Sequence, residues 1–506
     1  MILTVGSKLL GFVRELVLAY TFGASNITDA YLISLTIPTV LMSFVGAAVH
    51  TGFIPLYIRS RQENGEDGSL QFTRALIRRM MLFSFLILIA GWLFTRPLVL
   101  LFASGFSGET LELAVRFTRI TLLGVFFSGA LAVLSGFLQV NGHYLIPGMV
   151  GIPLNLILIA TFLSARKQGL TWLAAGSVLA LATQALMLFP LSRKLGLEKV
   201  FRREKSGPYL RQLGILILPV LLGTGVDQIN VLVDRTLASG IVEGGISALN
   251  YAARLSGFTE GIVLASILTV VFPVLSAQVA DQEVSSLKET IRDTTVLLAL
   301  LVLPASAGLM LFSGPIVEML FSRGAFGRQA VVLTAGALQF YSAGLIFSGI
   351  RGLITKVFYS MEDTRSPLAG AVIAVSANIM LNLILSRFMG LRGLALATSL
   401  SAALGMLVLL YGIRRKIGPL GFKKSLSSLV KILAATLVMA LILPGVFRYL
   451  LEQFSVSAAL LFAIATGVLV YGFLILLFRV KEARRISARL LENLKEWKNR
   501  YYGGRM

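Results

Sequence analysis

Three charged side chains in the first apolar stretch of the chain are the first residues that suggest chemistry. Residues 2–20 read as a membrane-spanning helix, yet they contain Lys8, Arg14 and Glu15. A charge at the centre of a membrane helix costs about 3 kcal/mol on insertion scales, so it faces other helices or a watery cavity. Guanidinium groups bind phosphate oxygens in pairs, and an ammonium adds a point charge. With Arg254 in a later apolar stretch, these cations predict a pocket for an anionic, phosphorylated amphiphile.

The same charges also have a structural interpretation, which the sequence leaves open. Arg14 with Glu15, and Asp234 with Arg235, are neighbouring opposite charges that could simply pair. Lys8 could extend its alkyl chain to the membrane surface instead of facing a cavity.

A second set of residues offers oxygen atoms. Asn378 and Asn382 are four residues apart and share one face of a helix. Thr398 lies in the next apolar segment, and Asp234 supplies a carboxylate from an earlier one. One carboxylate with several neutral oxygens suits a hard monovalent cation such as Na⁺ better than a transition metal. Spacing alone equally allows these side chains to be hydrogen-bonding partners between helices.

Composition sets the class of protein. Of 506 residues, 56% are hydrophobic and 14% are charged, whereas soluble proteins carry about 25% charged residues. The apolar runs match a bilayer core and lack the alternation of an outer-membrane barrel. The chain has no cysteine, and we find no nucleotide-binding, hydrolase or metalloprotease motif. We therefore expect an all-α polytopic membrane protein that is a transporter and not an enzyme.

The apolar runs predict about 14 transmembrane helices. Residues 1–20 lack the basic start and cleavage site of a signal peptide, so we expect them to remain as the first helix. The expected segments are residues 2–20, 29–57, 80–102, 117–140, 145–163, 170–191, 213–238, 248–277, 296–311, 331–359, 368–385, 393–413, 430–446 and 458–478. A polar loop, residues 59–68, should separate the second and third.

The net charge of +22 is concentrated in the even-numbered connections and the tail. This bias predicts that both termini are cytoplasmic, and it favours anionic membrane lipids over nucleic acid as the partner of the basic residues. The tail, residues 480–506, has apolar residues on one helical face and basic residues around them. We expect an amphipathic helix on the inner leaflet, with a plain soluble helix as the alternative.

Landmarks recur about 220 residues apart: Tyr31 and Tyr251, Pro55 and Pro273, Pro147 and Pro367. Six segments per copy keep both copies in the same orientation, related by an axis along the membrane normal. The expected organisation is an N-lobe (1–194), a basic cytoplasmic connector (195–212), a C-lobe (213–416), two further helices (417–479) and the tail (480–506). Transporters built in this way bind substrate between the two halves and expose it to each side in turn.

Several stretches together resemble the lipid II flippases of the MurJ (MviN) family, in the MOP exporter superfamily. They are SKLLGFVRE (7–15), FGA (22–24), TDAY (28–31), FIP (53–55), QINVLVDRTLASG (228–240), LNYAAR (249–254) and FYSMEDT (358–364). The resemblance covers nearly the whole chain. It implies two six-helix lobes plus a terminal pair, and movement of undecaprenyl-pyrophosphate-linked peptidoglycan precursor from the inner to the outer leaflet of the bacterial cytoplasmic membrane.

The resemblance also assigns residues. The family's cavity cations fall on Lys8, Arg14 and Arg254, and its neighbouring acids fall on Glu15 and Asp29. Its sodium site resembles Asp234, Asn378, Asn382 and Thr398, with the backbone near Leu394. The chain departs from the family pattern in three places: residues 39–44 carry no charge where many relatives have an arginine, Ala253 replaces an acid beside Arg254, and Asn382 replaces an acid.

The predicted function is therefore a lipid II flippase that works by alternating access, with Na⁺ as a coupling ion and no other cofactor. Three alternatives stay open. The first is a flippase for another lipid-linked oligosaccharide, which the departures favour. The second is a cation-coupled MATE-type drug exporter, which a basic pocket opposes. The third is a scaffold within a complex of cell-wall synthesis proteins.

Overall fold

The computed structural model of the chain describes residues 2–197 and 207–480, and these form helices joined by turns and short connections. The chain divides into two compact units. Unit 1 comprises Met1–Ala248 together with Phe321–Ala330, and unit 2 comprises Leu249–Leu320 with Val331–Met506. The expected tail helix and residues 198–206 of the expected connector lie outside the described residues.

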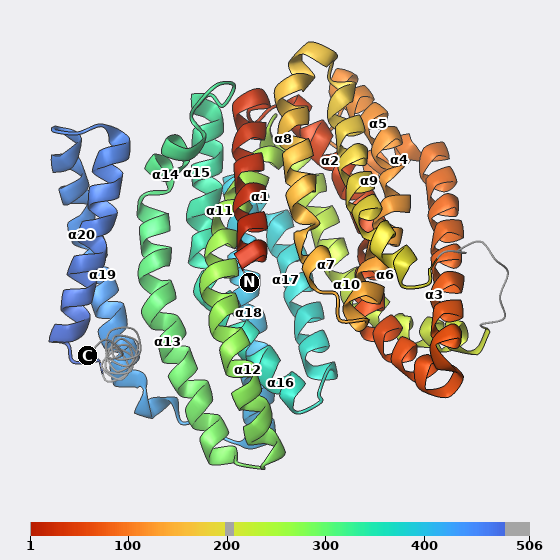
Figure 1. Cartoon of the computed structure of the whole chain (residues 1–506). Helices are drawn as coiled ribbons and strands as arrows, with labels where there is room; N and C mark the ends of the chain where they lie inside the picture. The colour runs from red at the N-terminus through yellow and green to blue at the C-terminus, as the bar shows by residue number, and fades with distance from the viewer. Residues whose placement is uncertain (1, 198–206, 481–506) are drawn as a thin grey trace, which may run out of the picture. The chain divides into compact units, whose positions relative to one another are not determined.

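Unit 1 contains the first ten α-helices, and α11 runs from it into unit 2 (Figure 1). Their bounds are α1 (Ile2–Phe22), α2 (Asn26–Ala48), α3 (Ile54–Leu93), α4 (Thr95–Phe102), α5 (Gly108–Thr121), α6 (Gly124–Val140), α7 (Leu145–Met149), α8 (Gly151–Gln168), α9 (Thr171–Lys194), α10 (Gly207–Ile241) and α11 (Gly245–Thr259). A π-helical turn, Val49–Phe53, joins α2 to α3.

Unit 2 contains the remaining helices. They are α12 (Ala265–Ala280), α13 (Val284–Leu311), α14 (Ser313–Phe321), α15 (Arg328–Ala343), α16 (Leu345–Ser360), α17 (Arg365–Met389), α18 (Leu391–Ile417), α19 (Leu426–Leu451) and α20 (Val456–Leu477). A π-helical turn, Glu260–Leu264, joins α11 to α12, and a short 3₁₀ turn, Phe422–Lys424, precedes α19. Within this unit α19 packs against α13 and α20 (Figure 1).

The prediction of an all-helical membrane fold is confirmed for the described residues. Each predicted segment falls on one helix or on consecutive helices. Nine of the described helices are long and apolar enough to cross a membrane, or eleven if each of two bent pairs counts as one span. The pairs are α5 with α6, bent by 42°, and α15 with α16, bent by 43°. The first helix, α1, is not among these nine, because it carries the three charged residues Lys8, Arg14 and Glu15.

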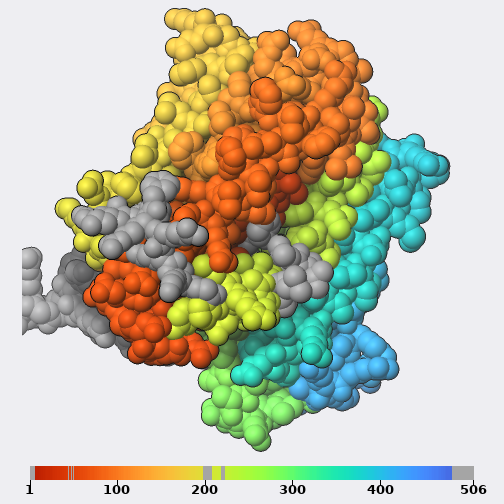
Figure 2. Space-filling view, turned by 90° about the vertical axis from the view of Figure 1, so that its right-hand side faces the viewer, coloured from red at the N-terminus to blue at the C-terminus, as the bar shows by residue number. Residues whose placement is uncertain are grey.

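The predicted polar loop at residues 59–68 is wrong in its conformation. The helix continues through these residues and reverses at Gly65, whose φ of 72° is readily adopted by glycine and rarely by other residues. The side chain of Tyr209, at the start of α10, donates a hydrogen bond of 2.6 Å to Glu63 and accepts one of 2.6 Å from Asn64. In Figure 2 this hairpin, in orange-red, lies at the surface beside the yellow-green start of α10. The charged residues therefore lie on an exposed helical hairpin, where water solvates them, and not in a loop.

The fourth predicted segment starts too late. The predicted start is residue 117, but α5 begins at Gly108 and includes Glu109, Glu112, Arg116 and Arg119. Arg119 lies 5.2 Å from the ring centroid of Trp92, and other charged residues of α5 are exposed. A polar first half on an otherwise buried helix resembles a loop in sequence, which explains the error.

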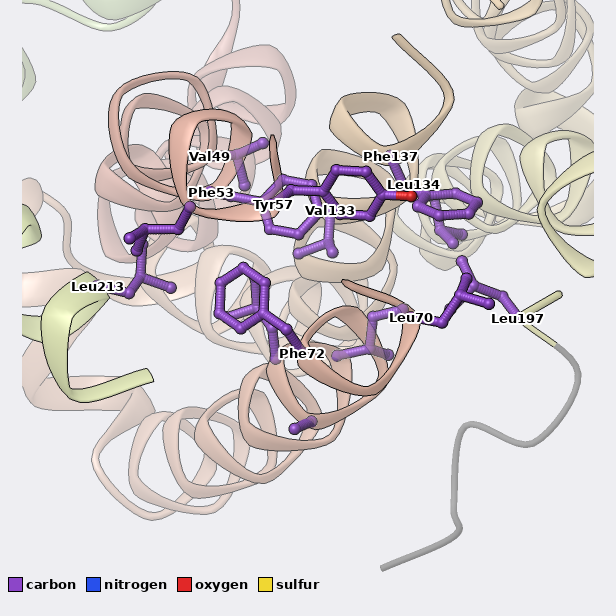
Figure 3. Packing of buried hydrophobic residues seen from close by; sticks show 14 of the residues in the cluster. Val49, Phe53, Tyr57, Leu70, Phe72, Val133, Leu134, Phe137, Leu197 and Leu213 are labelled. Atoms are coloured by element: carbon purple, nitrogen blue, oxygen red, sulfur yellow. The ribbon is translucent and has the colours of Figure 1, made fainter. Parts of the chain in front are cut away.

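Aromatic rings fill the core of unit 1 where α3, α6 and the turn after α2 meet (Figure 3). Phe53 stacks on Phe72 at 5.7 Å, and Tyr57 meets Phe137 edge-on at 5.8 Å between centroids. All four are fully buried. Van der Waals packing of this kind holds membrane helices together. The hydrophobic effect cannot do so, because lipid tails are as apolar as the side chains.

The two units each contain a polar contact of the same kind. In unit 1, Arg74 of α3 donates to the carbonyl of Gly196, which follows α9, at 2.7 Å. In unit 2, Arg292 of α13 donates to the carbonyl of Leu420, which follows α18, at 2.8 Å. Each arginine satisfies a carbonyl left open beyond a helix C-terminus.

Asp363 organises the connection between α16 and α17. Its carboxylate accepts hydrogen bonds from the backbone N–H of Arg365 and of Ser366, and from the Ser366 hydroxyl. Lys416, at the end of α18, pairs with the same carboxylate at 2.5 Å, and the Asp363 side chain is 12% exposed. Partial burial raises the pKa of Asp363, but Lys416 and Ser366 outweigh it and hold this pKa well below its usual range.

This geometry predicts a pH-dependent stability contribution from Asp363. Because the folded-state pKa lies below the unfolded value, the contribution is fully present above about pH 4 and disappears as the pH falls toward the folded-state pKa. Asp363→Asn should destabilise the detergent-purified protein by about 1–3 kcal/mol at pH 7, seen as a lower unfolding temperature. The difference from wild type should shrink below pH 4.

Glu362→Gln is the matched control, because Glu362 is the neighbouring acid and is exposed. It should leave the unfolding temperature unchanged. Equal unfolding temperatures for Asp363→Asn and wild type at pH 7 would contradict the assignment.

Candidate substrate-binding and cation sites

Arg14 and Glu15 form an ion pair within α1. The Arg14 Nη2 donates to the Glu15 Oε1 at 2.5 Å, and the two side chains are 20% and 5% exposed. Glu15 is adjacent in sequence, so it neutralises the arginine without help from another helix. A guanidinium has five N–H donors, more than this pair and the contact described next use.

Asn155 of α8 fixes the other side of the Arg14 guanidinium, and the sequence analysis missed it. Its Oδ1 accepts from Arg14 Nη1 at 3.2 Å, while its Nδ2 donates to the carbonyls of Ser7 and Gly151 at 3.2 and 2.8 Å. The residue is 4% exposed. A Cβ at Gly151 would overlap the Ser7 hydroxyl, so glycine lets α8 approach α1 closely. A lone Asn in an apolar run was the available signal.

Lys8 lies apart from this group. It is six residues before Arg14, which is about 9 Å along the helix axis, and its side chain is exposed. The structure therefore gives Arg14 and Glu15 a common set of contacts, but it does not include Lys8 in them.

Asp29 lies in the first turn of α2 and is buried. Its Oδ1 accepts hydrogen bonds from the backbone N–H and the hydroxyl of Ser247, at 2.7 and 2.6 Å. Ser247 lies in the first turn of α11, where backbone N–H groups lack partners within the helix. Arg235 of α10 donates to the neighbouring carbonyl of Ile246 at 3.1 Å. This geometry gives Asp29 a structural role, and a direct contact with substrate stays a prediction.

Arg254 and Asp234 belong to different units. Arg254 lies on α11 in unit 2 and is exposed, whereas Asp234 lies half-buried on α10 in unit 1. Each engages other groups of the protein. Their roles in the predicted anion and cation sites remain predictions.

Four of the predicted cation ligands come together in unit 2, where α17 packs on α18. The Asn378 amide donates to the hydroxyls of Thr398 and Ser401, at 3.5 and 3.3 Å. The Asn382 amide donates to the Asn378 Oδ1 at 2.7 Å. The Thr398 hydroxyl donates to the carbonyl of Leu394 at 3.1 Å. Ser401, which the sequence analysis omitted, is a further member, and its hydroxyl donates to the carbonyl of Thr398 at 2.9 Å.

The donor set of this oxygen cluster (Asn378, Asn382, Leu394, Thr398 and Ser401) fits a hard, weakly charged cation. It offers amide, hydroxyl and carbonyl oxygens, which suit such ions. The described residues contain no group of three or more His, Cys, Asp or Glu that could hold a metal. Rotating the two amides would turn their oxygens toward an ion, because the orientation of an amide follows its hydrogen-bond partners. Both sequence interpretations, ion site and interhelical hydrogen bonding, thus use the same atoms.

Comparison with known proteins identifies the family. The family model described as "Lipid II flippase MurJ" matches residues 18–467. A probable lipid II flippase MurJ of Vibrio cholerae is 31% identical over 431 residues, covering 81% of each chain.

Solved structures agree with this comparison. One is a lipid II flippase MurJ in an inward closed conformation, with a TM-score of 0.82 and 27% identity over 94% of this chain and 98% of that one. An inward-facing multidrug resistance MATE family transporter of the MOP superfamily shares the fold, with a TM-score of 0.70 at 15% identity over 83% of this chain and 98% of that one. The family match spans both units, including Asp29, Arg254 and the oxygen cluster, and the chain therefore belongs to the lipid II flippase MurJ family.

Proposed function

We propose that this chain moves lipid II, the undecaprenyl-pyrophosphate-linked peptidoglycan precursor, from the inner to the outer leaflet of the bacterial cytoplasmic membrane by alternating access. The observation that carries the proposal is the Arg14 guanidinium, held by Glu15 and Asn155 in an otherwise apolar helix. A charge kept at this cost is usually functional. Family membership supplies the class of substrate.

The chemistry of Arg14 matches a pyrophosphate. A guanidinium presents paired N–H donors that fit two oxygens of one phosphate. Glu15 and Asn155 hold the group from two sides, so binding an anion requires little further ordering of the side chain. Arg254 and Lys8 are the further cations proposed to bind the substrate, and the polyprenyl tail stays in lipid.

Both termini are cytoplasmic in this proposal, because the connections rich in Lys and Arg then face the cytoplasm. Anionic lipids of the inner leaflet contact these connections. Cell-wall synthesis proteins that supply or consume the precursor are the proposed protein partners.

A sodium ion is the proposed coupling ion. Asn378, Asn382, Thr398 and the Leu394 carbonyl would hold it, with Asp234 as the carboxylate and Ser401 as an additional neighbour. When bound, the ion supplies a positive charge that biases the conformational cycle. One charge moved across 100 mV is worth about 2.3 kcal/mol, which is enough to affect cycling.

A different lipid-linked oligosaccharide is the main competing substrate. The uncharged stretch at residues 39–44 and Ala253 make this chain less charged than the family pattern. Expression in a strain depleted of its own lipid II flippase distinguishes the two, because only a chain that accepts lipid II restores growth.

Arg14→Ala should reduce transport of lipid II by roughly 10- to 100-fold, the loss expected when a hydrogen bond to a charged group is removed. Arg14→Lys should fall between Arg14→Ala and wild type, because it keeps the charge without the paired donors. Arg254→Ala should also reduce transport. The measurement is the fraction of lipid II accessible in each leaflet of proteoliposomes. Arg116→Ala, an exposed arginine of α5, is the control. Normal transfer by both Arg14→Ala and Arg254→Ala would refute the mechanism.

Asn155→Ala should reduce transport by roughly tenfold, because Arg14 then loses one of its two supports. The double variant Arg14→Ala/Asn155→Ala should be no slower than Arg14→Ala alone, since residues that act through one another are not additive. Multiplicative losses in the double variant would show that Asn155 acts independently of Arg14. The same leaflet assay measures all three.

Asn378→Ala should weaken or abolish the dependence of transport on Na⁺, because it removes the central amide of the oxygen cluster. The exposed Ser376, on the same helix, gives the control Ser376→Ala. Initial rates are compared over a series of Na⁺ concentrations at constant ionic strength and with an imposed membrane potential. A wild-type rate that is independent of Na⁺ would exclude the ion from the cycle.

A further inference from the structure

Four connections at one end of unit 1 approach one another backbone to backbone, each at a glycine. The glycines are Gly23 after α1, Gly105 between α4 and α5, Gly244 before α11, and Gly324 in the Phe321–Ala330 segment. A Cβ added at any of the four would lie closer than 3.0 Å to a backbone atom of another connection or helix end, a distance that real Cβ atoms essentially never show. These close approaches exclude larger residues at all four positions.

The contacts follow one another in a continuous series. Gly105 faces the backbone of Ser239 and Gly240, at the end of α10. Gly244, a few residues later, faces the backbone of Ala24. Gly23 faces the carbonyl of Ala325, and Gly324 faces the carbonyl of Tyr20, at the end of α1.

Hydrogen bonds accompany this series. The backbone N–H of Gly105 donates to the Ser239 hydroxyl at 3.0 Å, and the Thr236 hydroxyl donates to the Leu101 carbonyl at 2.8 Å. The backbone N–H of Ala325 donates to the Tyr20 carbonyl at 2.8 Å. Each end of the series is thus fixed by a direct bond and not only by shape.

Aromatic rings anchor the Phe321–Ala330 segment. Phe321 stacks on Phe326 at 5.4 Å and meets Phe12 of α1 edge-on at 6.5 Å. Phe321 and Phe326 are almost fully buried. The segment is therefore packed into unit 1, although the helices on both sides of it, α14 and α15, lie in unit 2 for most of their length.

The two ends of the series are repeats of each other. Gly105 and Gly324 each lie shortly after a Leu-Phe pair, at residues 101–102 and 320–321, and shortly before a buried phenylalanine, Phe106 and Phe326. One meets the end of α10 and the other meets the end of α1, which are the first helices of the two sequence repeats. Because the same kind of contact occurs in both sequence repeats, we take it to be a regular element of the fold and not a chance approach.

We infer that these connections form a glycine clasp (Gly23, Gly105, Gly244 and Gly324 with their backbone partners) that closes the extracellular end of the transport path and opens when substrate leaves. The inference rests on the proposed function, because alternating access requires this end to open. The Phe321–Ala330 segment is continuous with helices of unit 2 at both ends, so a movement of those helices would pull it from its contacts. The clasp closes through glycine backbone and so without burying a charge.

The clasp is tested by cysteine labelling, because the chain has no cysteine of its own. Ser239→Cys places one thiol in the clasp, and a membrane-impermeant maleimide added outside cells measures how often it opens. In the Gly105→Ala background labelling should be roughly tenfold faster, because the added methyl overlaps backbone that cannot move aside and so favours the open state. Gly105 does not have a positive φ, so its substitution changes only the close approach.

Gly327→Ala is the matched control. Gly327 is three residues after Gly324, has no positive φ, as Gly105 has none, and a Cβ there meets nothing within 4 Å. It should leave labelling near the rate of Ser239→Cys alone. Thr236→Val, which removes one hydrogen bond without a steric clash, provides a second test if Gly105→Ala does not fold, and it should raise labelling by a smaller factor.

Equal labelling in the Gly105→Ala, Thr236→Val and Gly327→Ala backgrounds would overturn the clasp. Acceleration seen only when the reagent is supplied from the cytoplasmic side would overturn its extracellular placement. The assay needs no substrate, so a protein that shows the labelling difference but does not move lipid II would leave the clasp standing and reject the proposed function.

Discussion

The cost of placing charge inside a membrane is the constraint on which the rest of this structure depends. Arg14 lies in an apolar helix, and such a group persists only where the protein supplies its partners. Glu15 neutralises it from the same helix, and Asn155 binds it from α8. Asn155 is in turn held by two backbone carbonyls. The close approach of α8 to α1, made possible by Gly151, is thus part of what holds Arg14 in place.

The same constraint separates the acids into two kinds. Glu15 is buried beside the arginine that it neutralises. Asp29 is equally buried, but its carboxylate accepts the free N–H and hydroxyl of Ser247 at the start of a helix. Unpaired backbone donors at a helix start stabilise a negative charge. In sequence both residues are acids near the first helix, and only the structure shows that one serves an arginine and the other serves a helix end.

The sequence predicted the features that depend on pattern. Runs of apolar residues located the membrane helices, and the spacing of Asn378, Asn382 and Thr398 grouped side chains that the structure brings into one cluster. It failed where two sources of order compete. The charged residues near Gly65 suggested a loop because they are hydrophilic. A hydrophilic stretch can also be helical, as this one is. Asn155 was missed because one polar residue in an apolar run has no partner visible in sequence, since Arg14 lies 141 residues away.

Substrate binding and closure place opposite demands on the charged groups of a transporter. A site that must attract a pyrophosphate needs cations, and each of these must be kept partly hydrated or paired. A closure that forms and parts in every cycle has the opposite need, because burying and exposing ion pairs would add several kcal/mol of desolvation to each step. Backbone hydrogen bonds contribute about 1 kcal/mol net apiece, and glycine brings them within reach without side chains to reorder. A closure made of glycine backbone contacts therefore costs less to open and close in each cycle than one made of buried ion pairs.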